Sequence, residues 1–240
     1  MSYGTLYGIG VGPGDPELIT VKGARLLGEC SRLFVPKARM KSESVAYAIV
    51  QRYVNPKAVI EELVFPMVTD KEELEQKWNE SAAKIAQTLS TGADALFVTL
   101  GDSLLYSTYI YLVRALRKVA PEAKIVTVPG VTAFSAAAAL TNFPVGEGKE
   151  LVTIVPAADD LSSVRAALNG GGTVVMMKVG KRLGSIIEAI ENAGALDGAV
   201  FAAYAGLEGE RIETDLAKLK NEEPEAGYLS TILVHARKGS

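Results

Sequence analysis

The sequence predicts an α/β fold with mostly parallel or mixed sheets, arranged as two α/β domains. Short apolar runs alternate with helical patterns along the 240 residues, which is the first observation behind this prediction. The second is the run Ala95–Leu100, whose uninterrupted apolar character is typical of a parallel strand covered on both faces. With 48% hydrophobic and 22% charged residues, the chain has enough apolar surface to build well-buried cores.

Residues 1–117 are expected to form the N-terminal domain, in which strands and helices alternate. The apolar run that begins at Thr5 predicts the first strand, which breaks into a turn rich in glycine and proline. Ser42 or Ser44 is expected to cap the second helix. The other expected strands are Leu33–Val35, Val59–Phe65 and Ala95–Leu100, and the expected helices are Leu18–Cys30, the segment from the serine cap to Tyr53, Asp70–Leu89 and Thr108–Val119.

The segment 118–122, with Pro121 and alternating charge, is the expected linker to a C-terminal domain over 123–240. Short, closely spaced strands late in the chain favour a mixed sheet with antiparallel members at its edge. The strands expected here are 124–128, 152–155, 173–179, 200–204, 211–214 and 229–235, and the helices are 133–140, 161–168 and 183–193.

Composition excludes several classes of protein. No apolar run approaches the roughly 18 residues of a membrane helix, and no signal peptide is expected. Cys30 and His235 are the only residues of their types, which excludes an internal disulfide and a cysteine-built or histidine-rich metal centre. A single cysteine suits a reducing cytoplasm, where we expect the protein to reside. The net charge of −3 argues against nucleic-acid binding.

The turn after the first strand is the most informative stretch. Gly10, Gly12 and Gly14 let the backbone turn sharply and approach a ligand, and Asp15 is expected to accept backbone N–H bonds. A dinucleotide-binding fingerprint is excluded, because its third glycine would fall on Asp15 and no acidic residue follows at the ribose position. A phosphate-binding Walker loop is excluded as well, since no Gly-Lys-Ser/Thr follows.

Two further turns repeat this arrangement. Gly101-Asp102 follows the run Ala95–Leu100, and Pro129-Gly130 follows the strand expected at 124–128. In open α/β sheets, ligands bind at the carboxyl ends of strands, so Asp102 is placed to accept from a ribose hydroxyl or an amino group. The alternative is that Asp102 only caps its own turn.

The ordered motifs Gly10–Pro16, Gly101-Asp102 before Tyr106, and Pro129–Ala133 resemble the tetrapyrrole (corrin/porphyrin) methylase family from Leu6 to about His235. The stretches 34–39, 42–44 and 177–180 are most similar to the C-20 methyltransferases that act on precorrin-2 or cobalt-factor II in cobalamin biosynthesis. One position departs from the family pattern. Ser103 stands where a proline is usual, which predicts a looser second turn.

The resemblance implies a kidney-shaped homodimer of two-domain subunits, with S-adenosylmethionine folded in an active-site cleft between the domains. It also implies which residues line the cofactor. From the first domain these are Pro13, Leu100, Gly101, Asp102 and Leu105, and from the second domain they are Thr132, Ala133, Val179, Ala205 and Gly206. No metal ion bound by the protein is implied.

The implied reaction is an in-line attack of an electron-rich carbon of the tetrapyrrole on the methyl group, so catalysis is mostly positioning. A base that removes the proton afterwards is not identified by the residues. Asp102, Tyr106 and water are the candidates. The substrate carries eight carboxylates, and Lys37, Arg39, Lys41 and Lys178 are the cations expected to meet them, the alternative being solvated surface loops.

Other functions stay open at this point. They are a sibling methylase that acts at another ring carbon or on a different substrate, a nicotinamide-dependent dehydrogenase, and a nucleotide- or tetrapyrrole-binding protein without turnover. Neither a nucleic-acid nor a membrane partner is expected.

Overall fold

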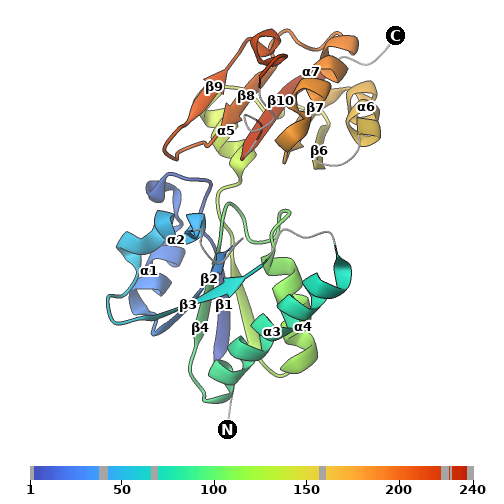
Figure 1. Ribbon diagram of the computed structural model, residues 1–240. Helices are drawn as coiled ribbons and strands as arrows, with labels where there is room; N and C mark the ends of the chain where they lie inside the picture. The colour runs from blue at the N-terminus through green and yellow to red at the C-terminus, as the bar shows by residue number, and fades with distance from the viewer. Residues whose placement is uncertain are drawn as a thin grey trace. The chain divides into compact units, whose positions relative to one another are not determined.

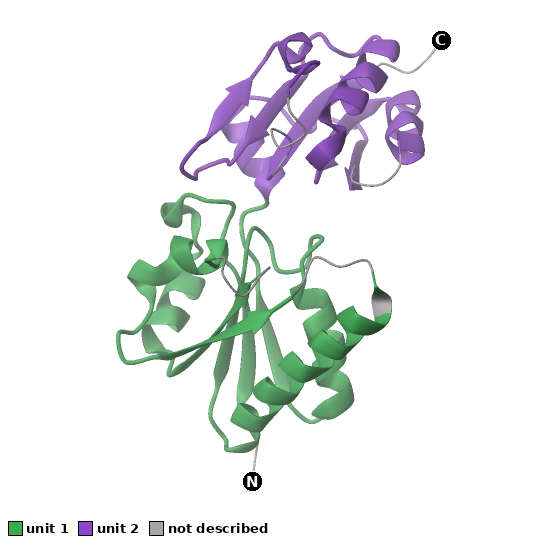
Figure 2. Ribbon diagram, in the orientation of Figure 1, with its two compact units in different colours: residues 1–132 green, residues 133–240 purple. Residues whose placement is uncertain are grey.

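The computed structural model describes residues 3–37, 43–65, 70–156, 161–222, 227 and 229–236. The chain divides into two compact units, residues 1–132 and 133–240 (Figure 2). Each unit contains one five-stranded sheet with its own helices (Figure 1). Within the described ranges, no helix is both long and apolar enough to cross a membrane.

The first unit is built on a fully parallel sheet with the strand order β3-β2-β4-β1-β5. The central strand β4 is buried at every position, as the apolar run at 95–100 predicts. The strands are β1 (Thr5–Gly10), β2 (Arg32–Lys37), β3 (Val59–Val64), β4 (Ala95–Thr99) and β5 (Lys124–Val128). The helices are α1 (Val21–Glu29), α2 (Val45–Val50), α3 (Lys71–Ser90) and α4 (Tyr109–Val119), with 3₁₀ turns η1 (Pro16–Leu18) and η2 (Gln51–Tyr53).

Helices cover both faces of this sheet, with α1 and α2 on one side and α3 and α4 on the other (Figure 1). Alternation along β4 explains the division, because Phe97 belongs to the core formed with α3 and α4 whereas its buried neighbours point the other way. The helices begin at polar caps. Ser44 accepts from the amide of Tyr47 at 3.3 Å, as predicted, and Asp70 accepts from two amides at the start of α3. Ser42 lies outside the described residues.

The division between the units lies later than the linker predicted at 118–122. That segment contains the end of α4 and the start of the short turn that leads to β5, and Ala120 within it and Ala123 just after it are buried in the core of the first unit. β5 pairs with β1 along its whole length, so it belongs to the first sheet. The boundaries 1–117 and 123–240 are therefore wrong, and the units meet after Thr132.

The second unit has a mixed sheet with the order β6-β7-β10-β8-β9, in which only β6 and β7 pair in parallel. The prediction of a mixed sheet with an antiparallel member at its edge is confirmed by β9, which pairs antiparallel with β8. A second antiparallel strand, β10, lies at the centre of the sheet, which the sequence did not predict. The sequence of β10 suits this central place, because six of its seven residues are buried. The strands are β6 (Val152–Pro156), β7 (Gly172–Met177), β8 (Val200–Ala203), β9 (Arg211–Glu213) and β10 (Ser230–Ala236).

Its helices divide unequally between the two faces of the sheet. The alanine-rich α5 (Ala133–Thr141) covers one face, where Ala137 and Ala138 pack on side chains of β7, β8 and β10. The other face carries the larger core, formed with α6 (Leu161–Gly170), α7 (Leu183–Asn192) and the 3₁₀ turn η4 (Leu216–Leu219). A further 3₁₀ turn, η3 (Gly180–Arg182), precedes α7. The two units thus have separate hydrophobic cores.

Candidate functional site

The three glycine turns predicted from the sequence lie together at the carboxyl ends of β4, β1 and β5, which are neighbours in the first sheet. We name them the first turn (10–16), the second turn (100–103) and the third turn (129–132). The first and second are joined by a two-residue antiparallel bridge. The amide of Gly12 donates to the carbonyl of Gly101 at 3.2 Å, and the amide of Gly101 donates to the carbonyl of Gly12 at 2.8 Å.

Glycine is required where these turns touch. A Cβ on Gly10 would lie 2.6 Å from the amide nitrogen of Gly130 and 2.7 Å from the carbonyl oxygen of Gly101, closer than real Cβ contacts allow. Gly12 and Gly101 also have φ of 84° and 69°, in the left-handed region that favours glycine. The three glycine motifs, which are far apart in the sequence, therefore form one close-packed backbone junction.

Asp15 behaves as predicted in the first turn. Its Oδ1 accepts from the amide of Glu17 at 2.8 Å and so caps η1, whose first residue is Pro16. The hydroxyl of Tyr53 donates to the carbonyl of Pro16 at 3.2 Å and fixes this turn to η2. Pro13 is buried within the turn. These contacts hold the first turn rigid without using a ligand.

Asp102 both caps its own turn and reaches the third turn. Its Oδ1 accepts from the amide of Leu104 at 2.8 Å, which is the turn-capping role left open by the sequence. Its Oδ2 accepts from the amide of Gly130 at 3.0 Å, a contact between residues 28 positions apart that the sequence did not predict. A carboxylate offers about four lone-pair sites, so Asp102 keeps capacity to accept from a ligand.

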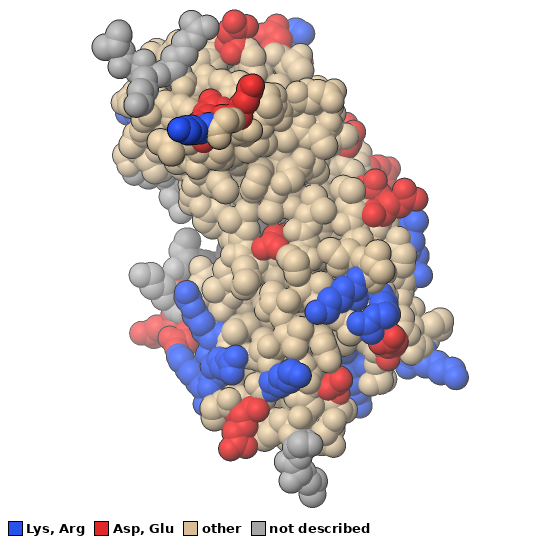
Figure 3. Space-filling model, turned by 180° about the vertical axis from the view of Figure 1, so that it is seen from behind, with Lys and Arg blue, Asp and Glu red and all other residues tan. Residues whose placement is uncertain are grey.

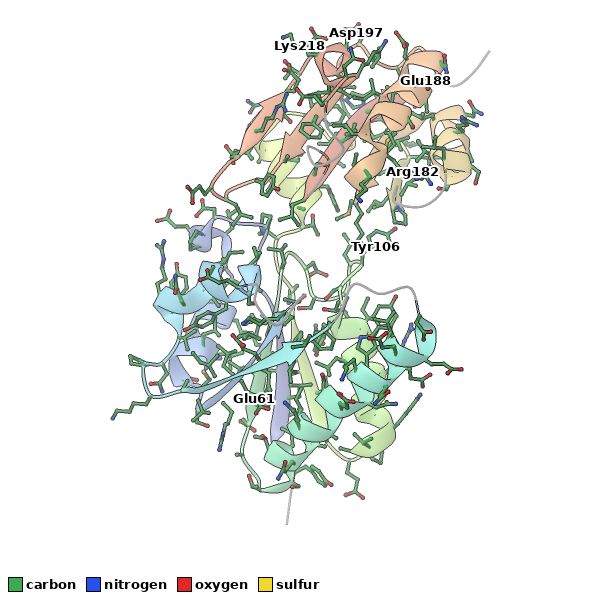
Figure 4. The ribbon with its side chains drawn as sticks, viewed as in Figure 1. Glu61, Tyr106, Arg182, Glu188, Asp197 and Lys218 are labelled. Atoms are coloured by element: carbon green, nitrogen blue, oxygen red, sulfur yellow. The ribbon has the colours of Figure 1, made fainter. Side chains whose placement is uncertain are left out.

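The structure gives Ser103 a contact that the sequence did not predict. It is completely buried, and its Oγ donates to the carbonyl of Val128, the last residue of β5, at 3.0 Å. The looser loop predicted from the loss of the family proline is therefore wrong, because a buried hydrogen bond fixes this position. The stretch that follows carries the half-buried Leu105 and the exposed Tyr106. Figure 4 shows Tyr106 on this loop, with its side chain extending away from the sheet of the first unit.

In the second unit, the predicted cofactor residues Val179, Ala205 and Gly206 follow the ends of β7 and β8. Both strands run antiparallel to β10, which lies between them, so their carboxyl ends lie at the same end of the sheet. Val179 is buried in the larger core, which leaves only its main chain to meet a ligand. Lys178 and Tyr204 precede these positions with φ of 57° and 53°.

The left-handed conformation of Lys178 and Tyr204 turns the chain sharply after the carboxyl ends of β7 and β8. Thr132 and Ala133 are half-buried and stand on either side of the division between the units.

Of the predicted substrate cations, Lys37 and Lys178 are described, while Arg39 and Lys41 lie outside the described residues. Lys37 ends β2 and forms an ion pair with Glu62 of β3 at 2.8 Å, with only 12% of its side chain exposed. Lys178 is exposed. The structure thus places Lys37 at the same carboxyl end of the first sheet as the glycine turns, but already paired with an acid.

Comparison with known proteins places the chain in a family. The model for "Tetrapyrrole (Corrin/Porphyrin) Methylases" matches residues 5–220. The chain belongs to this family.

Two curated relatives of this methylase are similar over nearly their whole length. A cobalt-precorrin-2 C(20)-methyltransferase of Salmonella typhimurium is 34% identical over 232 residues, which cover 97% of this chain and 96% of the relative. A precorrin-2 C(20)-methyltransferase of a Sinorhizobium species is 30% identical, with 96% and 95% covered.

Solved structures agree on the fold of the methylase. A cobalt precorrin-4 methyltransferase covers 96% of this chain and 94% of its own, with a TM-score of 0.73 and 22% identity. A uroporphyrin-III C-methyl transferase from Thermus thermophilus, complexed with S-adenosyl homocysteine, covers 97% of both chains, with a TM-score of 0.65 and 20% identity. The predicted two-domain α/β fold is confirmed by these likenesses.

Proposed function

We propose that this methylase transfers a methyl group from S-adenosylmethionine to C-20 of precorrin-2 or of cobalt-factor II in cobalamin biosynthesis. The observation that carries the proposal is the 34% identity, over nearly both whole chains, to a relative named for this ring position. The relatives include one named for the cobalt complex and one named for the metal-free ring. Either form of the substrate is therefore compatible with the chain.

The backbone around the second turn suits a cofactor that is recognised largely through main-chain groups. No atom beyond its chain neighbours lies within 4 Å of the position that a Cβ of residue 101 would occupy, so there is room above this backbone. We assign the cofactor to Pro13, Leu100, Gly101, Asp102 and Leu105 in the first unit. In the second unit we assign it to Thr132, Ala133, Val179, Ala205 and Gly206, with Val179 acting through its main chain.

S-adenosylmethionine supplies an electrophilic methyl group on a sulfonium. The residues of the chain then have to orient the two reactants and exclude competing geometries, since the ring carbon is itself nucleophilic. Removal of the proton from C-20 needs an acceptor near the reacting carbon. Tyr106 extends from the second turn, and Asp102 keeps free lone pairs. These two, with water, are the proposed acceptors.

A substrate with many carboxylates needs cations at its site, and we assign Lys37, Arg39, Lys41 and Lys178 to this role. On the face seen in Figure 3, Lys and Arg side chains are concentrated on the first unit although the whole chain has a net charge of −3. Such a local excess of positive charge favours the approach of an anionic substrate. We further propose that the methylase is a cytoplasmic homodimer.

The test is to incubate purified protein and S-adenosylmethionine with precorrin-2 and, separately, with cobalt-factor II. The expected product is heavier by one methyl group, and NMR should locate that group on C-20. A methyl group on another ring carbon would show a sibling methylase. Binding of S-adenosylhomocysteine and of the tetrapyrrole without any product would show a binding protein and contradict the proposed enzyme.

A further inference from the structure

A short apolar arch, Leu104-Leu105-Tyr106, stands between two buried serines at the carboxyl end of the first sheet. Ser103 is 0% exposed and Ser107 is 7% exposed, whereas Leu104 and Tyr106 between them are 60% and 37% exposed. A segment with exposed apolar side chains between two buried polar ones reverses the usual distribution. The arrangement therefore raises the question of what the two serines hold in place.

Ser103 fixes the arch to a strand that is not adjacent to its own. Its Oγ donates to the carbonyl of Val128 on β5, while the arch follows β4, and β1 lies between these two strands. Beside it, Asp102 accepts from the amide of Gly130 at 3.0 Å. The second turn thus crosses the end of β1 and is fixed to β5 and the third turn by two side-chain hydrogen bonds.

Ser107 fixes the other end of the arch. Its Oγ shares a 2.9 Å hydrogen bond with the Oγ1 of Thr99, the last residue of β4, and accepts from the amide of Tyr109, the first residue of α4, at 3.1 Å. All three residues are buried. The chain therefore leaves β4 at Thr99, forms the arch, and returns to the side chain of that same residue eight positions later.

The backbone between the two serines is held in an uncommon conformation. Tyr106 has φ of 51°, in the left-handed region that a large side chain rarely adopts. Residues in this region persist where the surrounding structure over-determines them. Ser103 and Ser107 supply that constraint from both sides of the arch.

We propose that Ser103 and Ser107 are positioning residues for methyl transfer. They set the shape of the arch before any ligand binds, so that Leu105 meets the cofactor and Tyr106 stands at the reacting carbon. This assignment rests on the function proposed above. A preformed arch spares the ligands the entropic cost of ordering it, and its effect should be seen in the kinetic constants of the reaction.

The experiment compares Ser103→Ala, Ser107→Ala and a matched control, Ser90→Ala. Ser90 also donates its hydroxyl to a carbonyl, that of Gln87 at 2.8 Å, but it lies at the far end of α3, before β4 begins. We expect Ser103→Ala to raise KM for S-adenosylmethionine about tenfold and to lower kcat, because a misplaced contact removes favourable orientation. Ser107→Ala should act in the same direction, and Ser90→Ala should leave both constants unchanged.

Urea unfolding and the fraction of active molecules separate positioning from loss of fold. A merely structural role would lower the unfolding midpoint and leave KM and kcat per folded molecule at wild-type values, which would overturn the proposal. Failure of the proposed function looks different, because the wild-type chain would then neither bind S-adenosylhomocysteine nor methylate a tetrapyrrole.

A second measurement needs no variant. Hydrogen exchange of the unliganded wild-type protein should be slow for the amide of Leu104, which donates to Asp102, and for the amide of Tyr109, which donates to Ser107. Adding S-adenosylhomocysteine should change this little. Fast exchange of both amides that becomes slow only with the ligand would show an arch formed by binding, and would overturn the proposal.

Discussion

At the scale of single residues, Gly8 and Tyr109 illustrate how the first sheet depends on a glycine, which leaves room for a neighbouring ring. Tyr109 is fully buried, its ring stacks on Phe97 with centroids 5.9 Å apart, and its hydroxyl shares a 3.1 Å hydrogen bond with Thr127 of β5. Burial raises the pKa of Tyr109, so the side chain stays neutral. The ring reaches β5 only because it passes over Gly8, where a Cβ would fall on the ring itself.

Gly8→Ala is therefore expected to destabilise the first unit by about 1–3 kcal/mol through overpacking. The matched control is Gly28→Ala in α1, where a Cβ would meet only the carbonyl oxygen of Tyr53, at 3.7 Å. That change should be neutral or stabilising by about 0.5 kcal/mol, because alanine is the better helix former. Urea unfolding followed by the fluorescence of Trp78, the only tryptophan, measures both. If Gly8→Ala were as stable as Gly28→Ala, the predicted clash between a Cβ at residue 8 and the ring of Tyr109 would be contradicted.

Asp102 links two turns, so its removal should affect ligand binding more than fold. Asp102→Ala leaves the amides of Leu104 and Gly130 without their acceptor and should weaken S-adenosylhomocysteine binding by about 1.5–3 kcal/mol. Asp70→Ala is the control, since Asp70 also accepts from two amides, but at the start of α3. The control should lower stability by about 1 kcal/mol and leave the affinity unchanged. Calorimetry that finds wild-type affinity in a folded Asp102→Ala would remove Asp102 from the site.

At the scale of elements, local signals in the sequence were sufficient to predict where most strands and helices lie along the chain. They were not sufficient to predict which strands pair with one another. The strand predicted at 124–128 is β5 with the same bounds, because Pro129 and the charged residues before it mark both ends. Which sheet it joins depends on pairing with β1, about 120 residues earlier, and no local signal encodes that. The central place of β10 in the second sheet was missed for the same reason.

The candidate site divides in the same way. Gly10, Gly101 and Asp102 could be singled out because glycine and acidic residues at strand ends have few structural uses other than turns and ligands. Ser103 was noted only as a departure from the family pattern, and its buried contact could not be predicted, since a serine in a loop is usually solvated. Its importance comes from burial and from the carbonyl of Val128, which are tertiary properties.

The pairing of β5 with β1 leads to a test with two fragments. A chain of residues 1–132 contains all five strands of the first sheet and its core, and should unfold cooperatively in urea. A chain of residues 1–122, which ends at the linker predicted from the sequence, lacks β5 and the hydroxyl partner of Tyr109. It should be unfolded or strongly destabilised, because β1 then becomes an unpaired edge. A stable fragment 1–122 would show that β5 is dispensable.

At the scale of the whole molecule, the proposed homodimer needs an apolar surface beyond the two cores. The second unit offers one candidate around α5 and β6, where Leu140, Leu151 and Val152 are exposed. Sedimentation equilibrium at micromolar concentration should give about twice the subunit mass of 25.4 kDa, as expected for a closed two-fold pair. A monomer at that concentration would contradict the proposed dimer without affecting the fold.

The last prediction concerns how a ligand couples the two units. Because their cores are separate, unfolding of each unit is expected to be its own transition. Trp78 lies on α3 and reports on the first unit alone, whereas circular dichroism reports on both. S-adenosylhomocysteine is proposed to contact both, so unfolding either one should release it.

At a ligand concentration of 100 times Kd, opening of either unit from the fully folded, bound chain should therefore cost about 2.7 kcal/mol more, and slower hydrogen exchange of the amides in β1 and in β10 should show this in both units. In urea only the unit that unfolds first should gain, because the other then unfolds without ligand. Asp102→Ala should reduce this gain in both units together, although the substitution lies in the first unit only. If the ligand slowed exchange in β1 and left exchange in β10 unchanged, then Val179, Ala205 and Gly206 would not belong to the site, and the assignment of a cofactor shared by the two units would be wrong.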